Sequence, residues 1–151
     1  MSAYDDANLV SGIERLLESS GIQVLELSIS RHRAGVKAKA VIFVSAGTGT
    51  DDCAAATRLI RPQIQVALGV QDPEIEVSSP GIDRVFKSSR DWKAFVGERI
   101  KYLMKGESEW KSGVLEAFDG KIARISEPKG KSAVDILSVA KARLDASREG
   151  E

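Results

Sequence analysis

Hydrophobic residues recur along the chain with two different periods, and each period predicts a different kind of element. The first amphipathic segment has apolar residues at the i, i+3, i+4, i+7 spacing of a helix: Leu9, Val10, Ile13, Leu16 and Leu17. Asp5 or Asp6 is the expected N-cap, and Gly21 stands where a left-handed residue would end the helix. The chain therefore opens with a helix that buries one side.

A period of two replaces this pattern after Gly21. Leu25, Leu27 and Ile29 alternate with polar residues, and a second alternating run covers residues 36–44. The turn residues 31–35 separate the two runs. Two alternating segments joined by a short turn predict an antiparallel hairpin.

A second helix and a third strand complete the first half of the chain. Thr50 or Asp51 is the expected N-cap, and Gly69 the expected end. Pro62 lies inside the periodic segment, so we expect a kink or break near Arg61, because proline removes a backbone hydrogen bond. Residues 74–78 alternate again. The order helix, strand, strand, helix, strand predicts a small α+β sandwich with both helices on one sheet face.

The second half has shorter segments. A helical turn over residues 91–96 is expected to end at Gly97, and strands are expected over residues 99–104, 111–118, 121–126 and 132–137, with a last turn packed by residues 139–144. Asp119-Gly120 and Pro128-Lys129-Gly130 are hairpin turn signals. We predict a small closed or nearly closed β-barrel. The fold class is then α+β, with an α/β domain over residues 1–80 and a barrel domain with a polar tail over residues 81–151.

Charge is divided between the two halves, although the formal net charge is zero. Residues 1–79 hold 7 Lys or Arg against 10 Asp or Glu, whereas residues 80–151 hold 15 against 12. Within residues 84–105 the balance is seven basic residues to two acidic ones. Such a run is either a solvated face or a surface for phosphate groups.

The residues that carry common chemistries are scarce. Cys53 and His32 are the single cysteine and the single histidine, which cannot build a Cys/His zinc site. Cys53 is expected in the first turn of a helix as a small half-buried residue, and His32 on the surface. Phosphate-binding loops and nucleophile motifs are absent from the sequence. We expect a cytoplasmic protein without catalytic activity, metal or cofactor.

The dense turn Ser78-Ser79-Pro80-Gly81 lies where the charge balance changes sign, directly before Asp83 and Arg84. By composition it is a linking turn or a set of polar groups offered to a partner. The string Glu-Val-Ser-Ser-Pro-Gly-Ile-Asp-Arg, residues 76–84, resembles the signature of the bacterial ribosome maturation factor RimP family. Further similar motifs follow the family's order: Gly21-Ile22, Thr50-Asp51-Asp52-Cys53, residues 91–97, Gly113-Val114-Leu115 and residues 140–144.

This resemblance implies an α/β N-terminal domain and an SH3-like barrel of the Sm type. It also implies a non-catalytic role in maturation of the small (30S) ribosomal subunit, through binding of the pre-30S particle, its rRNA and a basic ribosomal protein near the decoding centre. Val85-Phe86 departs from the family's usual Pro-Leu, which puts the interdomain geometry in doubt.

The expected binding surface combines residues of the signature-like string 76–84 with cations of the basic segment 84–105. Its residues are Ser78, Ser79, Pro80, Gly81, Asp83, Arg84, Lys87, Arg90, Lys93 and Lys101. The cations are expected to contact rRNA phosphates, and the acidic first domain a basic protein. We expect a monomer. The alternative is a protein-interaction adaptor whose barrel holds a peptide, which requires an aromatic-lined groove. Trp92 and Trp110 are expected to pack rather than to stack on bases.

Overall fold

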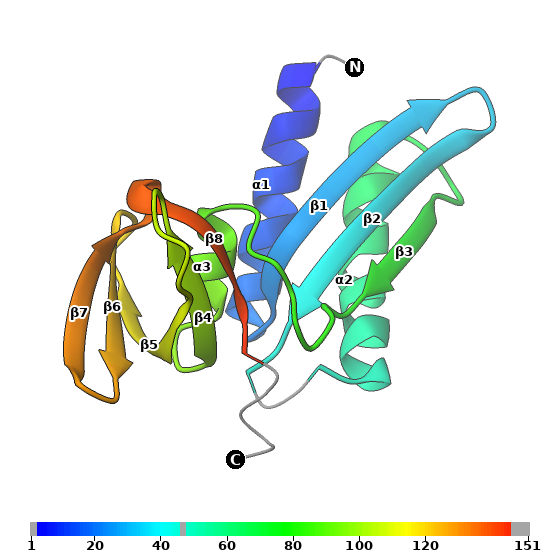
Figure 1. Cartoon of the computed structure of the whole chain (residues 1–151). Coiled ribbons are helices and arrows are strands. Elements are labelled where there is room, and N and C mark those ends of the chain that lie inside the picture. The colour runs from blue at the N-terminus through cyan, green and yellow to red at the C-terminus, as the bar shows by residue number, and fades with distance from the viewer. Residues whose placement is uncertain (1–2, 46–47, 146–151) are drawn as a thin grey trace. The chain divides into compact units, whose positions relative to one another are not determined.

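The computed structural model of the chain describes residues 3–45 and 48–145 (Figure 1). The chain divides into two compact units, which are residues 1–80 (unit 1) and residues 81–151 (unit 2). The described residues form three α-helices and eight strands in two separate sheets, so the α+β class is confirmed.

Unit 1 has the predicted order of elements. They are α1 (Ala3–Ser19), β1 (Gln23–His32), β2 (Gly35–Phe43), α2 (Thr50–Leu68) and β3 (Glu74–Ser78). The sheet order is β1-β2-β3, with β1 antiparallel and β3 parallel to β2. The predicted hairpin is therefore confirmed, and β3 joins the sheet after a crossover through α2 (Figure 1).

The core of unit 1 lies between the two helices and one face of the sheet. Its buried residues include Ile13 and Leu17 of α1, Val36, Ala38, Ala40 and Ile42 of β2, and Ala56, Ile60 and Ile64 of α2. Alternate residues of β2 thus point to both helices, as expected for a sheet covered on one side. A β-bulge between Val24 and Glu26 shifts the alternation of β1, and Val24 joins this core.

Three expectations about the helices of unit 1 are wrong. Helix α1 begins at Ala3, before Asp5 and Asp6. The N-cap of α2 is Gly49, whose N–H donates to the Asp52 carboxylate at 2.8 Å, so neither Thr50 nor Asp51 caps the helix.

Helix α2 also runs through Pro62 without a break. A proline removes only one helical hydrogen bond, and the fully buried Ile60 and Ile64 hold the helix to the sheet on both sides of it. Gly69 ends α2 in the left-handed conformation at φ 65°, as predicted.

Unit 2 contains a short helix and one antiparallel sheet. The elements are α3 (Ser89–Ala94), β4 (Arg99–Met104), β5 (Lys111–Phe118), β6 (Ile122–Glu127), β7 (Gly130–Asp135), a 3₁₀ turn (Ile136–Ser138) and β8 (Val139–Leu144). The sheet order is β7-β6-β5-β4-β8. Both predicted hairpin turns are confirmed, since β5–β6 and β6–β7 pair across them.

The end of unit 2 differs from the prediction. The last predicted strand is displaced to Gly130–Asp135, and residues 139–144 form strand β8 rather than a last turn. Strand β8 pairs with β4 along its length, for example Tyr102 with Ala142. Such pairing joins segments about 40 residues apart, which local periodicity does not reveal.

The core of unit 2 is built from alternate residues of these strands and an aromatic cluster. Buried strand residues include Ile100, Tyr102, Leu115, Ile125 and Ala142. Phe86 packs on Trp92 and Phe95 at ring distances of 5.0 and 5.2 Å, and Trp92 packs on Phe118 at 6.3 Å. The aromatic cluster attaches α3 to the sheet.

The Tyr102 hydroxyl donates a hydrogen bond to the Glu127 carboxylate. Burial, and then the adjacent carboxylate, raise the pKa of Tyr102 above its usual value of 10.0. Since the unfolded chain releases this proton more readily, we expect the free energy of unfolding to fall as the pH rises above about 10. Tyr102→Phe should remove this part of the pH dependence. Urea titrations at pH 8 to 11 test it, and equal slopes for both proteins would contradict it.

Candidate nucleic-acid interface

The turn of residues 78–81, which lies in the string that resembles the family signature, connects the two units. Ser78 is the last residue of β3, and the residues after it leave the sheet. Ser78, Ser79 and Gly81 are exposed, and Pro80 is half-buried. The Arg84 N–H donates to the Gly81 carbonyl at 3.1 Å, which closes the turn. The polar groups of this segment are accessible to a partner.

Arg84 itself lies inside unit 2, so the phosphate contact expected of it has to be corrected. Its side chain is 8% exposed, and its Nε donates to the Asp91 carboxylate at 2.8 Å. Asp91 is fully buried and also accepts the backbone N–H groups of Lys87 and Ser88, at 3.0 and 3.2 Å. The pair ties the segment after the turn to the start of α3. Arg84 is a structural residue.

Three other predicted cations lie on the surface beside α3. Lys87 precedes the helix, whereas Arg90 and Lys93 are three residues apart within it and so share a face. All three are exposed. Arg90 and Lys93 line a hollow of about 370 Å³ together with Ser89 and the β5–β6 turn, residues 118–120. Asp83, by contrast, is paired with Arg143 at 3.2 Å.

Lys101 does not join that group, because it lies on β4. Cross-strand pairing places it directly opposite Arg143 of β8, and Leu103 opposite Lys141. The buried neighbours Ile100, Tyr102 and Ala142 point to the core, so Lys101, Lys141 and Arg143 share the outer face of the sheet. Lys141 and Arg143 were not among the expected site residues. Their alternation around Ala142 was the signal available in the sequence.

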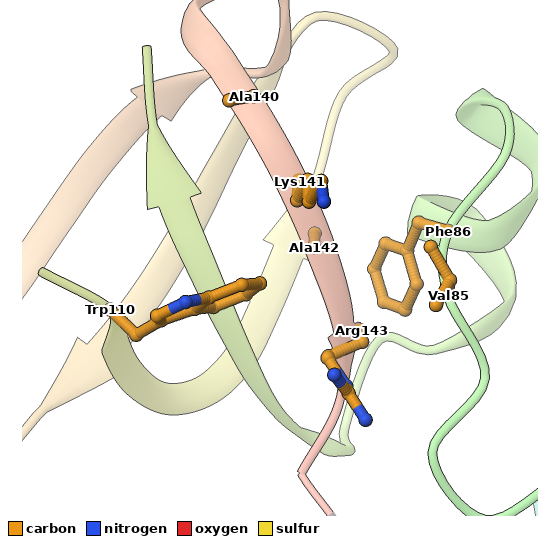
Figure 2. A pocket seen from close by; sticks show the side chains of 7 residues that line it. All are labelled: Val85, Phe86, Trp110, Ala140, Lys141, Ala142 and Arg143. Carbon is orange, nitrogen blue, oxygen red and sulfur yellow. The ribbon is translucent and has the colours of Figure 1, made fainter. Parts of the chain in front are cut away.

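A second hollow, of about 230 Å³, lies on this side of unit 2. Figure 2 shows its lining residues: Val85, Phe86, Trp110, Ala140, Lys141, Ala142 and Arg143. The Trp110 ring lies on one side of β8 and Phe86 on the other, and Lys141 and Arg143 project from the strand between them (Figure 2). Trp110 is 40% exposed, whereas Trp92 is 5% exposed. The expectation that Trp92 packs is confirmed, whereas Trp110 packs only in part and keeps an exposed surface.

Few of the aromatic side chains of unit 2 form a surface groove. Trp92, Phe95 and Tyr102 are buried, and Phe86 is half-buried against Trp92. Trp110 is thus the aromatic residue that this face offers to a ligand, which gives the adaptor hypothesis little support.

The remaining residues with reactive side chains show no assembled site. Cys53 is half-buried in the first turns of α2, and His32 is exposed at the end of β1. Within residues 3–45 and 48–145, no three His, Cys, Asp or Glu side chains gather as metal ligands would. No helix in the described part of the chain has the length and apolar character to cross a membrane. A scan of the chain against models of known protein families found no match.

Proposed function

We propose that this protein is a ribosome maturation factor for the small (30S) subunit, which acts by binding the pre-30S particle and not by catalysis. It would work in the cytoplasm, as a monomer and without a cofactor. The proposal is based on the resemblance to the RimP family. The observation that supports it most directly is the division of charge between the two units.

The cations of unit 2 support a contact with rRNA. Lys87, Arg90 and Lys93 are exposed beside α3, and Lys101 lies on the outer face of the sheet. Lysine and arginine side chains on a surface bind the phosphate backbone, and each neutralised phosphate releases counterions. Unit 2 is therefore the RNA-binding part in this proposal.

Unit 1 carries the opposite charge and suits a basic protein. Glu74 and Glu76 of β3 are exposed, with side chains 69% and 53% accessible, on the sheet face away from the core. Lys37 of β2 forms ion pairs with both carboxylates, at 3.7 and 3.3 Å. Opposite charge favours association with a basic ribosomal protein near the decoding centre. One chain would then bridge protein and RNA.

The sheet of unit 2 is, in this proposal, an SH3-like barrel of the Sm type. Its strand order supports the assignment, because the last strand β8 lies beside the first strand β4 while β5, β6 and β7 follow as a meander. Strong curvature of such a sheet brings its two edges together.

Co-sedimentation with purified mature and immature small subunits tests the proposed function. We expect binding that prefers immature particles and weakens as salt rises, because the contacts are to phosphates. A Lys87→Ala/Lys93→Ala variant should bind about tenfold more weakly. The matched control is Lys121→Ala/Lys131→Ala, which loses the same charge, from a residue directly before β6 and from one in β7, and should bind normally.

Two results would contradict the proposal. Absence of binding to either particle at low salt would remove the ribosome as partner. The second result concerns the proposal that one chain bridges protein and RNA. Glu74→Lys/Glu76→Lys should weaken binding of the basic protein more than binding of RNA. Equal losses of affinity for the protein and for RNA would count against the bridge.

A further inference from the structure

We infer that the outer face of β4 and β8, with Trp110 at its edge, binds single-stranded RNA. A base stacks on the Trp110 indole while Lys101, Lys141 and Arg143 contact the phosphates. The inference rests on the proposed function and deepens it, because it names the form of RNA and the surface that holds it.

The register of β4 and β8 brings three cations together on one face of the sheet. Lys101 lies directly opposite Arg143, and Lys141 is two residues before Arg143 on the same strand and the same face. Residues two apart in a strand are separated by about 6.6 to 6.8 Å, and directly opposite residues have Cβ atoms about 5 Å apart. Three cations thus form a compact group on one sheet face.

This arrangement of like charges has an electrostatic cost for the sheet. Like charges directly opposite on neighbouring strands destabilise a sheet. Among the described residues, Lys101 and Lys141 have no carboxylate in ion-pair distance. Arg143 is partly compensated by Asp83, but its Nε is buried without a hydrogen-bond acceptor in the described part of the chain. A surface that serves only stability would place opposite charges across the strands, so this face suits a polyanion.

Trp110 lines the same hollow as Lys141 and Arg143 and offers an exposed aromatic surface there. Trp110 is outside the aromatic cluster of Phe86, Trp92, Phe95 and Phe118, and 40% of its surface is accessible. Its ring lies beside β8 at the edge of the hollow, and Lys141 and Arg143 stand next to it (Figure 2). No carboxylate is among the residues that line this hollow. A flat apolar surface beside cations matches a base and its phosphate.

These features favour single-stranded RNA over an acidic peptide. Proteins that bind single strands combine a basic groove with aromatic side chains on which bases stack. A duplex keeps its bases stacked inside and offers none to Trp110. An acidic peptide would use the cations and leave the indole face without a specific partner, whereas RNA uses both.

The test uses the full chain and an oligouridine of about ten nucleotides, a length within the range of single-strand sites. We expect RNA binding to quench the tryptophan fluorescence of the protein. Trp110→Ala should weaken binding about tenfold, as measured by the fluorescence anisotropy of labelled RNA. Trp110→Phe should keep most of the affinity but lose the quenching. Lys101→Ala/Lys141→Ala should reduce the slope of log K against log salt by about 1.4, from two lost phosphate contacts. Lys121→Ala/Lys131→Ala is the control and should change neither the affinity for oligouridine nor the slope of log K against log salt.

Several outcomes would overturn the inference. The first is an affinity for a duplex RNA of the same length that equals the affinity for oligouridine. The second is an oligoglutamate peptide of the same charge that competes as well as oligouridine does. The third is a Trp110→Ala variant that binds oligouridine as tightly as the unchanged protein. Particle binding that survives loss of Lys101, Lys141 and Trp110 would overturn this inference and leave the proposed function. Oligouridine binding without particle binding would overturn the proposed function and leave this surface as an RNA site.

Discussion

Asp91→Ala is expected to lower the free energy of unfolding of unit 2 by about 3–5 kcal/mol, the usual cost of breaking a buried ion pair by removing one partner. The Asp91 carboxylate is fully buried and holds the Arg84 guanidinium at 2.8 Å. Without it, a charge that is 8% exposed loses the carboxylate 2.8 Å from its Nε. The backbone N–H groups of Lys87 and Ser88 lose an acceptor as well.

Urea unfolding followed by Trp92 fluorescence, in a Trp110→Phe background, measures this loss. The matched control is Asp83→Ala, which removes a carboxylate from an exposed pair with Arg143 and should cost at most about 1 kcal/mol. Arg84→Met/Asp91→Leu should cost less than Asp91→Ala, because it removes both charges. If Asp91→Ala behaved like Asp83→Ala, the structural role of the Arg84–Asp91 pair would have to be abandoned.

Gly113→Ala should have the second large effect, a loss of about 2–3 kcal/mol in unit 2 from overpacking. Gly113 lies in β5, and a Cβ on it would meet the backbone carbonyl oxygen of Ser126 in β6 and lie 2.9 Å from Ile125 Cγ2. Ile125 is fully buried, and the carbonyl is backbone, so neither can easily move aside. The two strands would have to separate where β5 also pairs with β4.

Thermal unfolding of the full chain tests the effect, with Gly12→Ala as the control. Gly12 lies inside α1, and a Cβ there would meet only a side-chain nitrogen of Arg15 at 3.9 Å. Alanine is favoured over glycine in a helix by about 1 kcal/mol, so this variant should be stabilised. A normal melting temperature for Gly113→Ala would show that β5 and β6 tolerate a wider spacing than the structure has.

The candidate site could be predicted in part from the sequence. The basic run located Lys87, Arg90 and Lys93, which are exposed in the structure, because charge clusters depend on local composition. The same run included Arg84, whose partner Asp91 is seven residues away and buried. Local composition does not show whether a cation is buried or exposed, so it could not distinguish Arg84 from the three exposed cations.

The amino-acid sequence by itself determined the order of the helices and strands as far as β7, and the two hairpins of unit 2. It also determined that Gly69 ends α2, since these follow from periods of 3.6 and 2 and from local turn chemistry. Only the tertiary structure decided that α2 continues through Pro62, that Arg84 pairs with Asp91, and that β8 lies beside β4.

The physical reason is the distance along the chain over which each feature is specified. The pairing of Lys101 with Arg143, which assembles the proposed RNA surface, depends on contacts between segments that only packing brings together. Periodicity placed Lys101 on a strand but predicted a turn over residues 139–144, which contain Arg143, and it carried no information about which strands are neighbours.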